Sequence, residues 1–206
     1  MPIKEDKVQG LFDAKQYGHF YLPEVVVNLL VGLTQPSPGE RVLGIGFYPE
    51  SLGSSLRSRV ETQFVSTEML PSEQFQTLSS QFFDVILCAP AFGVLSPESN
   101  QPSEEVWLQW SIDHLSETGR IAALVPIGLL SNYSQEPFRR FLLEKSGLEA
   151  VIELPSGWAQ GTAIYCTLRQ TLILNARSGC SVSQRLKMCH GQFLKVKSAD
   201  QIPVYL

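Results

Sequence analysis

Short apolar runs separated by polar, turn-forming segments occupy most of the chain. Five of these runs are long enough for buried strands, and they cover residues 41–47, 62–70, 83–89, 120–126 and 148–155. The run at 83–89 is almost continuously apolar, which is typical of a parallel strand that is covered on both faces. The pattern therefore predicts a sheet enclosed between layers of helices.

Segments between these runs carry apolar residues at helical spacing. The first begins near Pro23, a residue type that suits the first turn of a helix, and ends at the turn QPSPGE. Two more are expected from Ser103 to Gly119 and from Ser134 to Gly147, because serine often caps a helix and glycine often ends one. Strands that alternate with helices in this way predict an α/β fold.

The pattern changes after residue 161. Two long strands, at 162–177 and 180–188, are joined by Ser178-Gly179, which favours an antiparallel hairpin. The fold class expected is a three-layer α/β sandwich with a mostly parallel sheet and a C-terminal antiparallel hairpin. The parts expected are a polar N-terminal segment at 1–16, the α/β domain at 17–177, and the hairpin or extension at 178–206.

Charge is distributed unevenly along the chain. Residues 1–150 contain 10 Lys and Arg against 18 Asp and Glu, whereas residues 151–206 contain 6 against 2. A protein that binds DNA alone usually has a basic face, because phosphate neutralisation supplies most of the affinity. Only the C-terminal quarter offers one, and an unevenly charged solvated surface explains the same counts. The candidate DNA contacts are Arg169, Arg177, Arg185, Lys187, Lys195 and Lys197.

Composition argues against membrane and metal proteins. No apolar run reaches the roughly 18 residues of a membrane span, and the N-terminal stretch MPIKEDKVQG is polar, so we expect a cytoplasmic protein without a membrane partner. The four cysteines have no metal-ligand spacing, and neither His114 nor His190 has a second ligand nearby. We expect no metal site.

Four segments, taken in order, resemble one family. They are GHFYLPEVVVNLLVGLTQPSPGE at 18–40, FDVILCAPAFG at 83–93, GRIAALVPIGLLS at 119–131 and PFRRFLLEKSGLEAVIELP at 137–155. Their order is similar to that in adenine-N6 DNA methyltransferases, particularly the modification (M) subunits of type I restriction-modification systems. The resemblance implies a Rossmann-like methyltransferase fold, with S-adenosylmethionine lying across the carboxyl ends of the first strands.

The resemblance also implies a substrate loop after the strand at 83–88. In the family this loop reads Asn-Pro-Pro-Phe or Asn-Pro-Pro-Tyr. The Asn side chain and the next carbonyl accept hydrogen bonds from the target amine, and the aromatic ring stacks on the flipped-out base. Here Ala89 replaces the Asn, while Pro90 and Phe92 keep their positions. These three residues are positional remnants of the catalytic loop.

The cofactor loop departs from the family as well. Where the resemblance implies an Asp followed by a glycine-rich turn, this chain has Gly44, then Gly46, then Tyr-Pro-Glu at 48–50. Tyrosine and proline do not permit the close approach that glycine does. The resemblance assigns the remaining cofactor contacts to Tyr21 and Glu68, although an exposed glutamate at a strand end explains Glu68 equally simply.

Two functions remain open at this point. The first is a degenerate domain, a pseudoenzyme, that has lost S-adenosylmethionine binding and acts through protein or nucleic-acid contacts, with a protein partner or complex expected and DNA bound only within a complex. The alternative is an active S-adenosylmethionine-dependent adenine-N6 methyltransferase with an altered cofactor loop. An unrelated α/β protein is the remaining, less favoured interpretation. The first two differ in whether the cofactor binds.

Overall fold

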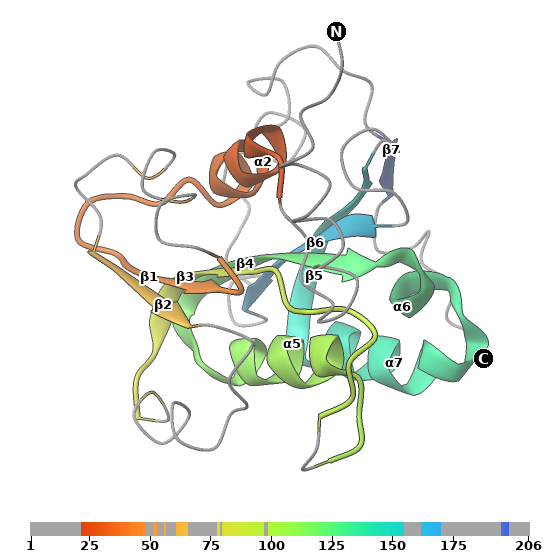
Figure 1. The fold of residues 1–206 in the computed structure, drawn as a ribbon. Helices are drawn as coiled ribbons and strands as arrows, with labels where there is room; N and C mark the ends of the chain where they lie inside the picture. Colours follow the sequence, from red (N-terminus) through yellow and green to blue (C-terminus); the bar gives the residue numbers. More distant parts are fainter. Residues whose placement is uncertain are drawn as a thin grey trace, which may run out of the picture.

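One twisted sheet forms the centre of the molecule in the computed structural model (Figure 1), which describes residues 22–47, 52, 56, 61–65, 78, 80–96, 99–154, 162–169 and 195–197. The strands within these residues are β1 (Arg41–Ile45), β2 (Glu61–Val65), β3 (Phe83–Cys88), β4 (Leu115–Pro126), β5 (Ser146–Glu153), β6 (Thr162–Arg169) and β7 (Lys195–Lys197). The helices are α2 (Glu24–Thr34), α5 (Ser103–Asp113), α6 (Ile127–Ser131) and α7 (Glu136–Lys145), with a 3-10 turn η1 (Tyr133–Gln135) before α7.

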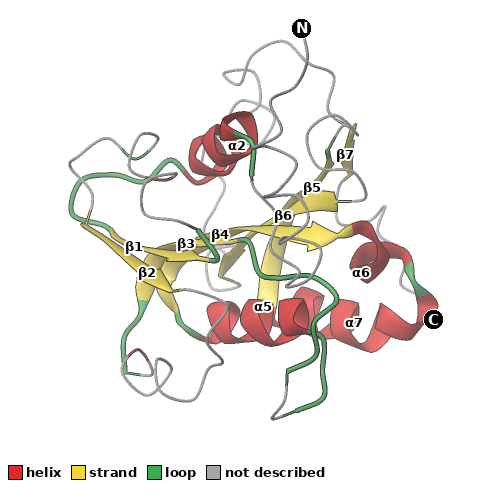
Figure 2. Cartoon of the chain, viewed as in Figure 1, coloured by secondary structure: helices red, strands yellow, loops and turns green. Residues whose placement is uncertain are grey.

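The helices lie on both faces of the sheet. Helix α2 covers one face, and α5 and α7 lie side by side along the other (Figures 1 and 2). This arrangement confirms the three-layer α/β sandwich. No helix within the described residues is long and apolar enough to cross a membrane.

The strand order is β2-β1-β3-β4-β6-β5-β7. Strands β1, β2, β3 and β4 are mutually parallel, and β6 is antiparallel to both of its neighbours, β4 and β5. The mostly parallel sheet and its antiparallel C-terminal component are therefore confirmed, although β6 lies inside the sheet and not at its edge. The second strand of the expected hairpin, at 180–188, lies outside the described residues.

Strands buried on both faces explain the continuous apolar runs. In β3, Ile86 and Cys88 pack on the side of α5, whereas Val85 and Leu87 pack on the side of α2. The same alternation holds in β4, where Ile121 and its partners at every second position face α5. The buried positions of both strands are apolar because neither face meets water there, whereas polar residues such as Asp84 lie toward the amino ends of the strands.

The end of α5 differs from the sequence prediction. The helix stops at Asp113 and Leu115 already belongs to β4, so Gly119 is not a helix end. Gly119 instead lies where the β3–β4 register shifts, and a Cβ there would come within 2.9 Å of the Phe83 carbonyl oxygen. The glycine allows a close approach between two strands.

The boundaries of α7 also differ. Ser134 lies in η1, and Gln135 occupies the cap position before Glu136. The helix ends at Lys145, and Gly147 pairs inside β5. The Ser146 hydroxyl donates to the Leu142 carbonyl at 2.7 Å, so a serine side chain satisfies the helix end where a glycine was expected.

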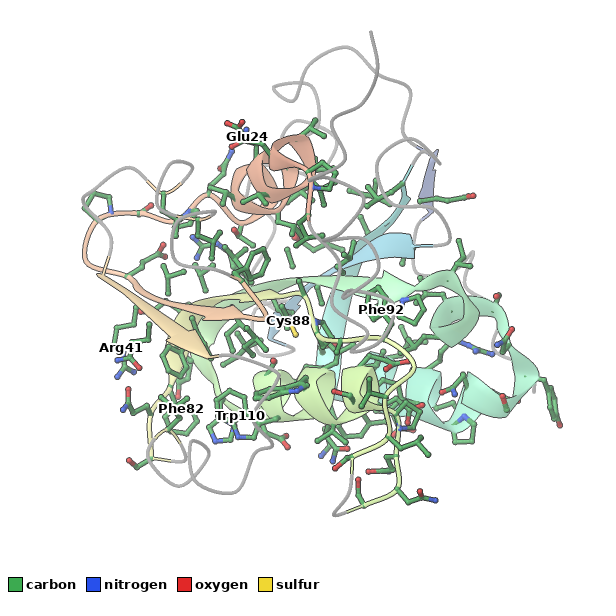
Figure 3. The ribbon with its side chains drawn as sticks, viewed as in Figure 1. Glu24, Arg41, Phe82, Cys88, Phe92 and Trp110 are labelled. Carbon is green, nitrogen blue, oxygen red and sulfur yellow. The ribbon has the colours of Figure 1, made fainter. Side chains whose placement is uncertain are left out.

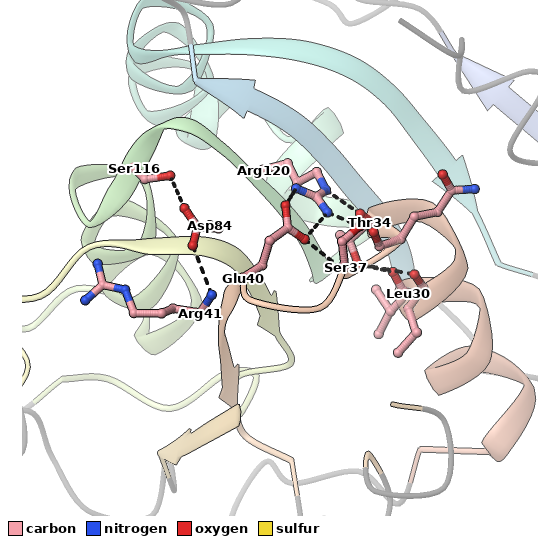
Figure 4. A network of polar contacts seen from close by, with 10 residues as sticks. Leu30, Thr34, Ser37, Glu40, Arg41, Asp84, Ser116 and Arg120 are labelled. Carbon is pink, nitrogen blue, oxygen red and sulfur yellow. Dashed lines mark hydrogen bonds and ion pairs between the residues drawn. The ribbon is translucent and has the colours of Figure 1, made fainter. Parts of the chain in front are cut away.

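Two polar ties hold the amino ends of the parallel strands together (Figure 4). The Arg120 guanidinium pairs with Glu40 at 2.8 Å and also donates to the Thr34 and Gln35 carbonyls at the end of α2. The Asp84 carboxylate accepts the Arg41 backbone N–H at 2.9 Å and the hydroxyl of the serine at 116 at 2.8 Å. These contacts join α2, β1, β3 and β4 at the edge opposite the expected ligand side.

Candidate functional site

The expected cofactor loop and the expected substrate loop meet at the carboxyl ends of β1 and β3. Ile45 pairs with Cys88 in the parallel register, so the residues that follow, Gly46 and Ala89, leave the sheet side by side. The Ala89 N–H donates to the Ile45 carbonyl at 2.8 Å. Two segments that are 43 positions apart in the sequence thus form one edge.

Gly46 provides the contact between these two loops. Its φ is +75°, a conformation that side chains other than glycine rarely adopt. A Cβ on Gly46 would lie 2.0 Å from the Ala89 carbonyl oxygen and 2.8 Å from its carbon. The space on that side of Gly46 is therefore filled by the backbone of the substrate-loop segment.

The substrate-loop segment is apolar and largely buried. Ala89 is 8% exposed, and Pro90 and Ala91 are buried beside it. Phe92 is half-buried and packs against the apolar cluster on the α2 side, which also contains Phe47 and Ala89 (Figure 3). Residues 89–92 carry no side-chain hydrogen-bonding group. Only their backbone could contact a polar substrate.

Cys88, directly before this segment, is not a nucleophile in this structure. Its side chain is fully buried, and burial raises the pKa of its thiol to about 12, although a hydrogen bond with Ser111 lowers it. A thiol with such a pKa is not ionised at neutral pH. Cys88 is therefore a buried packing residue with a free thiol.

The chain after Phe92 folds back onto the start of α5. Gly93 turns with φ +71°. The Ser103 N–H donates to the Val94 carbonyl at 2.8 Å, and Leu95 forms an antiparallel bridge with Pro102. Glu104, the second residue of α5, is buried beneath this turn. Sequence reasoning missed Glu104, because acidic residues are common in the first turn of any helix and give no further signal.

The other expected cofactor contacts are only partly described. Gly44 is buried in β1 and pairs with Phe64 on one side and Leu87 on the other. Tyr21 and Glu68 lie outside the described residues. Cofactor binding by these positions stays a prediction.

The expected DNA contacts do not gather at one place where their backbone is described. Arg169 pairs with Ser146, the first residue of β5, whereas Lys195 pairs with Glu153, the last. Seven positions of extended strand separate the two, or roughly 23 Å. Lys197 lies beside Val151 and thus near Lys195. The expected contacts Arg177, Arg185 and Lys187 lie outside the described residues.

Metal chemistry has no support in the described part of the chain. No group of three or more His, Cys, Asp or Glu side chains there could hold a metal ion. The His114 ring stacks on the Trp110 ring with centroids 3.9 Å apart, and its Nδ1 lies 2.8 Å from the Trp110 carbonyl oxygen. These contacts make His114 a packing residue at the end of α5.

Solved structures share this fold at low sequence identity. The M protein of the EcoKI type I restriction enzyme is 15% identical with a TM-score of 0.55, over 76% of this chain and 45% of that one. A protein from Vibrio vulnificus YJ016, assigned as a modification subunit of a type I restriction enzyme, is 19% identical with a TM-score of 0.57, over 80% and 48%. A protein from Listeria monocytogenes, assigned as a class I S-adenosylmethionine-dependent methyltransferase, is 14% identical with a TM-score of 0.58, over 79% and 64%.

These likenesses establish the Rossmann-like methyltransferase fold that the resemblance implied. The chain spans less than half the length of the two type I modification proteins. No curated protein is significantly similar to it in sequence. Residues 72–177 match the family described as N-6 DNA Methylase, and this segment makes up more than half of the 206 residues. It contains β3, the substrate-loop segment and the strands up to β6, and the chain therefore belongs to the N-6 DNA methylase family.

Proposed function

We propose that this chain is a non-catalytic member of the N-6 DNA methylase family that acts through contacts with a protein partner. The observation that carries the proposal is Ala89. It stands where the family's substrate loop has an asparagine, and its methyl group lies in an apolar cluster. A domain that keeps its fold but lacks the group that contacts the substrate is suited to binding and not to chemistry.

The chemistry of amine methylation explains why Ala89 matters. The adenine amino group donates its lone pair into the ring, and hydrogen-bond acceptors must localise that pair before it attacks a methyl group. By analogy with the deletion of an oxyanion-hole donor, the loss of one such group costs about 2.7–4 kcal/mol, a factor of roughly 10² to 10³ in rate. The Ala89 carbonyl is no substitute, because it lies against Gly46.

An active S-adenosylmethionine-dependent methyltransferase is the competing function. The retention of Pro90 and Phe92 directly after β3 favours it, since these positions supply the backbone acceptor and the stacking ring in the family. Gly46 favours it too, as a glycine of the cofactor loop. In this case, residues 44–50 would hold the cofactor in a rebuilt geometry.

Calorimetric titration with S-adenosylmethionine separates the two functions. A non-catalytic domain without cofactor should give no binding heat up to about 1 mM ligand, which corresponds to an affinity weaker than roughly −4 kcal/mol. Micromolar binding would contradict the loss of the cofactor and would make transfer of a labelled methyl group to unmethylated duplex DNA the deciding assay. Methyl transfer by the wild-type protein would refute the proposal.

The Ala89→Asn variant is the matched control for that assay. It restores the side-chain acceptor at one position and leaves the rest of the loop unchanged. If both proteins bind the cofactor but only the variant transfers methyl groups, the lesion lies in the substrate loop. If neither binds it, the lesion lies in the cofactor loop. Thermal unfolding of both proteins checks that the asparagine is tolerated in its apolar surroundings.

A protein partner is proposed from the structural neighbours, because the EcoKI M protein, whose fold this chain shares, is a component of a type I restriction enzyme. Direct DNA binding would have to use the basic residues after 150. A gel shift with duplex DNA at low salt tests this directly, and the absence of any shift would leave a protein as the direct partner.

A further inference from the structure

Glu104 is a buried acid at the start of α5, directly below the substrate-loop segment. Its side chain is only 8% exposed, although it is in the first turn of a helix, where acidic side chains usually reach solvent. Its carboxylate accepts hydrogen bonds from its own backbone N–H and from the N–H of Gly93. The Oε2 atom is buried without a hydrogen-bond partner among the described residues.

Gly93 is the point at which this contact acts on the loop. Its φ of +71° favours glycine, and nothing lies within 4 Å of the position that a Cβ would occupy. Glycine is thus favoured there by its backbone conformation and not by a lack of space. The hydrogen bond from its N–H to Glu104 is a contact that can hold this turn, and the next one, from the Ser103 N–H to the Val94 carbonyl, comes one residue later.

Burial, two backbone N–H groups and one neighbouring acid make up the electrostatic surroundings of the Glu104 carboxyl. Burial raises the pKa of its carboxyl, whereas the two backbone N–H groups lower it. The acidic neighbour on α5 is Glu105, whose pKa is raised by burial and in part by Glu104, and lowered by a hydrogen bond with Gln135. Residues 89–96, the segment that contains Gly93, carry no titratable side chain.

We propose that Glu104 is the positioning residue of the substrate-loop segment. It fixes the turn at Gly93 and, through this turn, the ring of Phe92 against the apolar cluster on the α2 side. The inference goes beyond the proposed function, because it concerns the geometry of the loop and holds whether or not the chain transfers methyl groups. The Glu104 side chain itself touches no ligand in this proposal.

Amide exchange and the chemical shift of the Gly93 N–H, followed by NMR, test the proposal. In the wild-type protein this N–H should exchange slowly, and its shift should follow a single acid-base transition with a midpoint above about 4.3, the ordinary value for glutamate. In Glu104→Gln the transition should vanish while slow exchange remains, because the amide oxygen still accepts the bond. In Glu104→Ala the exchange should become at least about tenfold faster.

Glu105→Gln is the matched control, since it removes the neighbouring acid and leaves the Gly93 contact in place. The transition at Gly93 should persist in this variant with its midpoint unchanged. A transition that survives in Glu104→Gln, or equal exchange rates in the wild type and Glu104→Ala, would overturn the proposal. If Glu104→Ala does not fold, the pH profile of Glu104→Gln decides the question alone.

Discussion

Replacing Gly46 by alanine tests whether the cofactor loop and the substrate-loop segment are held together by backbone contact. The added methyl group would lie 2.0 Å from the Ala89 carbonyl oxygen, well inside van der Waals contact. Because the obstacle is backbone and not a flexible side chain, the carboxyl ends of β1 and β3 must separate. The separation would break the hydrogen bond from the Ala89 N–H to the Ile45 carbonyl.

The magnitude follows from three contributions. A positive φ costs alanine roughly 1–2 kcal/mol relative to glycine. Overpacking against a close neighbour costs about 1–3 kcal/mol. The lost hydrogen bond adds on the order of 1 kcal/mol. Together they predict that Gly46→Ala lowers the free energy of unfolding by about 3–6 kcal/mol.

Gly39→Ala is the matched control for this experiment. Gly39 also has a positive φ, of +89°, but nothing lies within 4 Å of its Cβ position. Its substitution should cost only the conformational part, about 1–2 kcal/mol. Urea unfolding followed by circular dichroism gives both values. Equal losses in the two variants would refute the close contact between Gly46 and Ala89, because φ alone would then explain them.

Three further predictions concern the ion pair at the amino ends of the strands and the buried thiol of Cys88. Arg120→Ala should lower the free energy of unfolding by about 2–3 kcal/mol, because the Arg120 side chain is only 16% exposed and also binds the end of α2. Arg140→Ala should lower it by less than about 0.5 kcal/mol, because that side chain is 41% exposed and forms an i,i+4 pair with Glu136. Urea unfolding measures both losses, and similar values would contradict the expected difference. Hydrogen bonding to Arg120, partly opposed by burial, lowers the pKa of Glu40, so its stabilising contribution is present above the ordinary pKa and is lost as pH falls through the lowered folded-state value. Unfolding of wild type and Glu40→Gln between pH 7 and pH 2 should show the gap closing over that range; a constant gap would contradict it. Cys88 should resist iodoacetamide at pH 8 until the protein unfolds, and peptide mass spectrometry that finds it alkylated in the folded state would refute its burial.

The strands of the sheet could be predicted because each one is marked by its own run of apolar residues, which needs no knowledge of distant parts of the chain. A strand such as β3 is covered on both faces, so all of its positions except Asp84 are apolar, and a single run identifies it. The helix α2 could be predicted in the same way, because Val26, Leu30 and Leu33 recur at helical spacing and form its buried face. These segments also carry the family resemblance, which predicts a cofactor loop at Gly46 and a substrate loop at Ala89, at the carboxyl ends of the first strands.

Helix ends and Glu104 could not be predicted, because their causes lie in distant residues. Gly119 has the form of a helix stop, but its glycine is required by the Phe83 carbonyl, which is 36 positions away in the sequence. Glu104 looks like an ordinary first-turn acid in the sequence, and its burial follows from tertiary packing and not from its place in the helix. Local propensity identifies a helix, whereas tertiary contacts decide where it ends and which of its polar side chains are enclosed.

Position 89, at the carboxyl ends of the strands, can change more freely than Glu40 and Arg120 at the amino ends, although its neighbour Gly46 cannot. At the amino edge, Glu40 and Arg120 satisfy each other, and Arg120 also satisfies two carbonyls of α2, so a change in either partner leaves polar groups without their contacts. At the carboxyl edge, an alanine at position 89 leaves no charge behind and packs into an apolar cluster. An apolar residue at position 89 leaves no buried polar group without a partner. The non-catalytic function proposed above requires this difference, because the fold must persist while the residues at the carboxyl ends of β1 and β3 change.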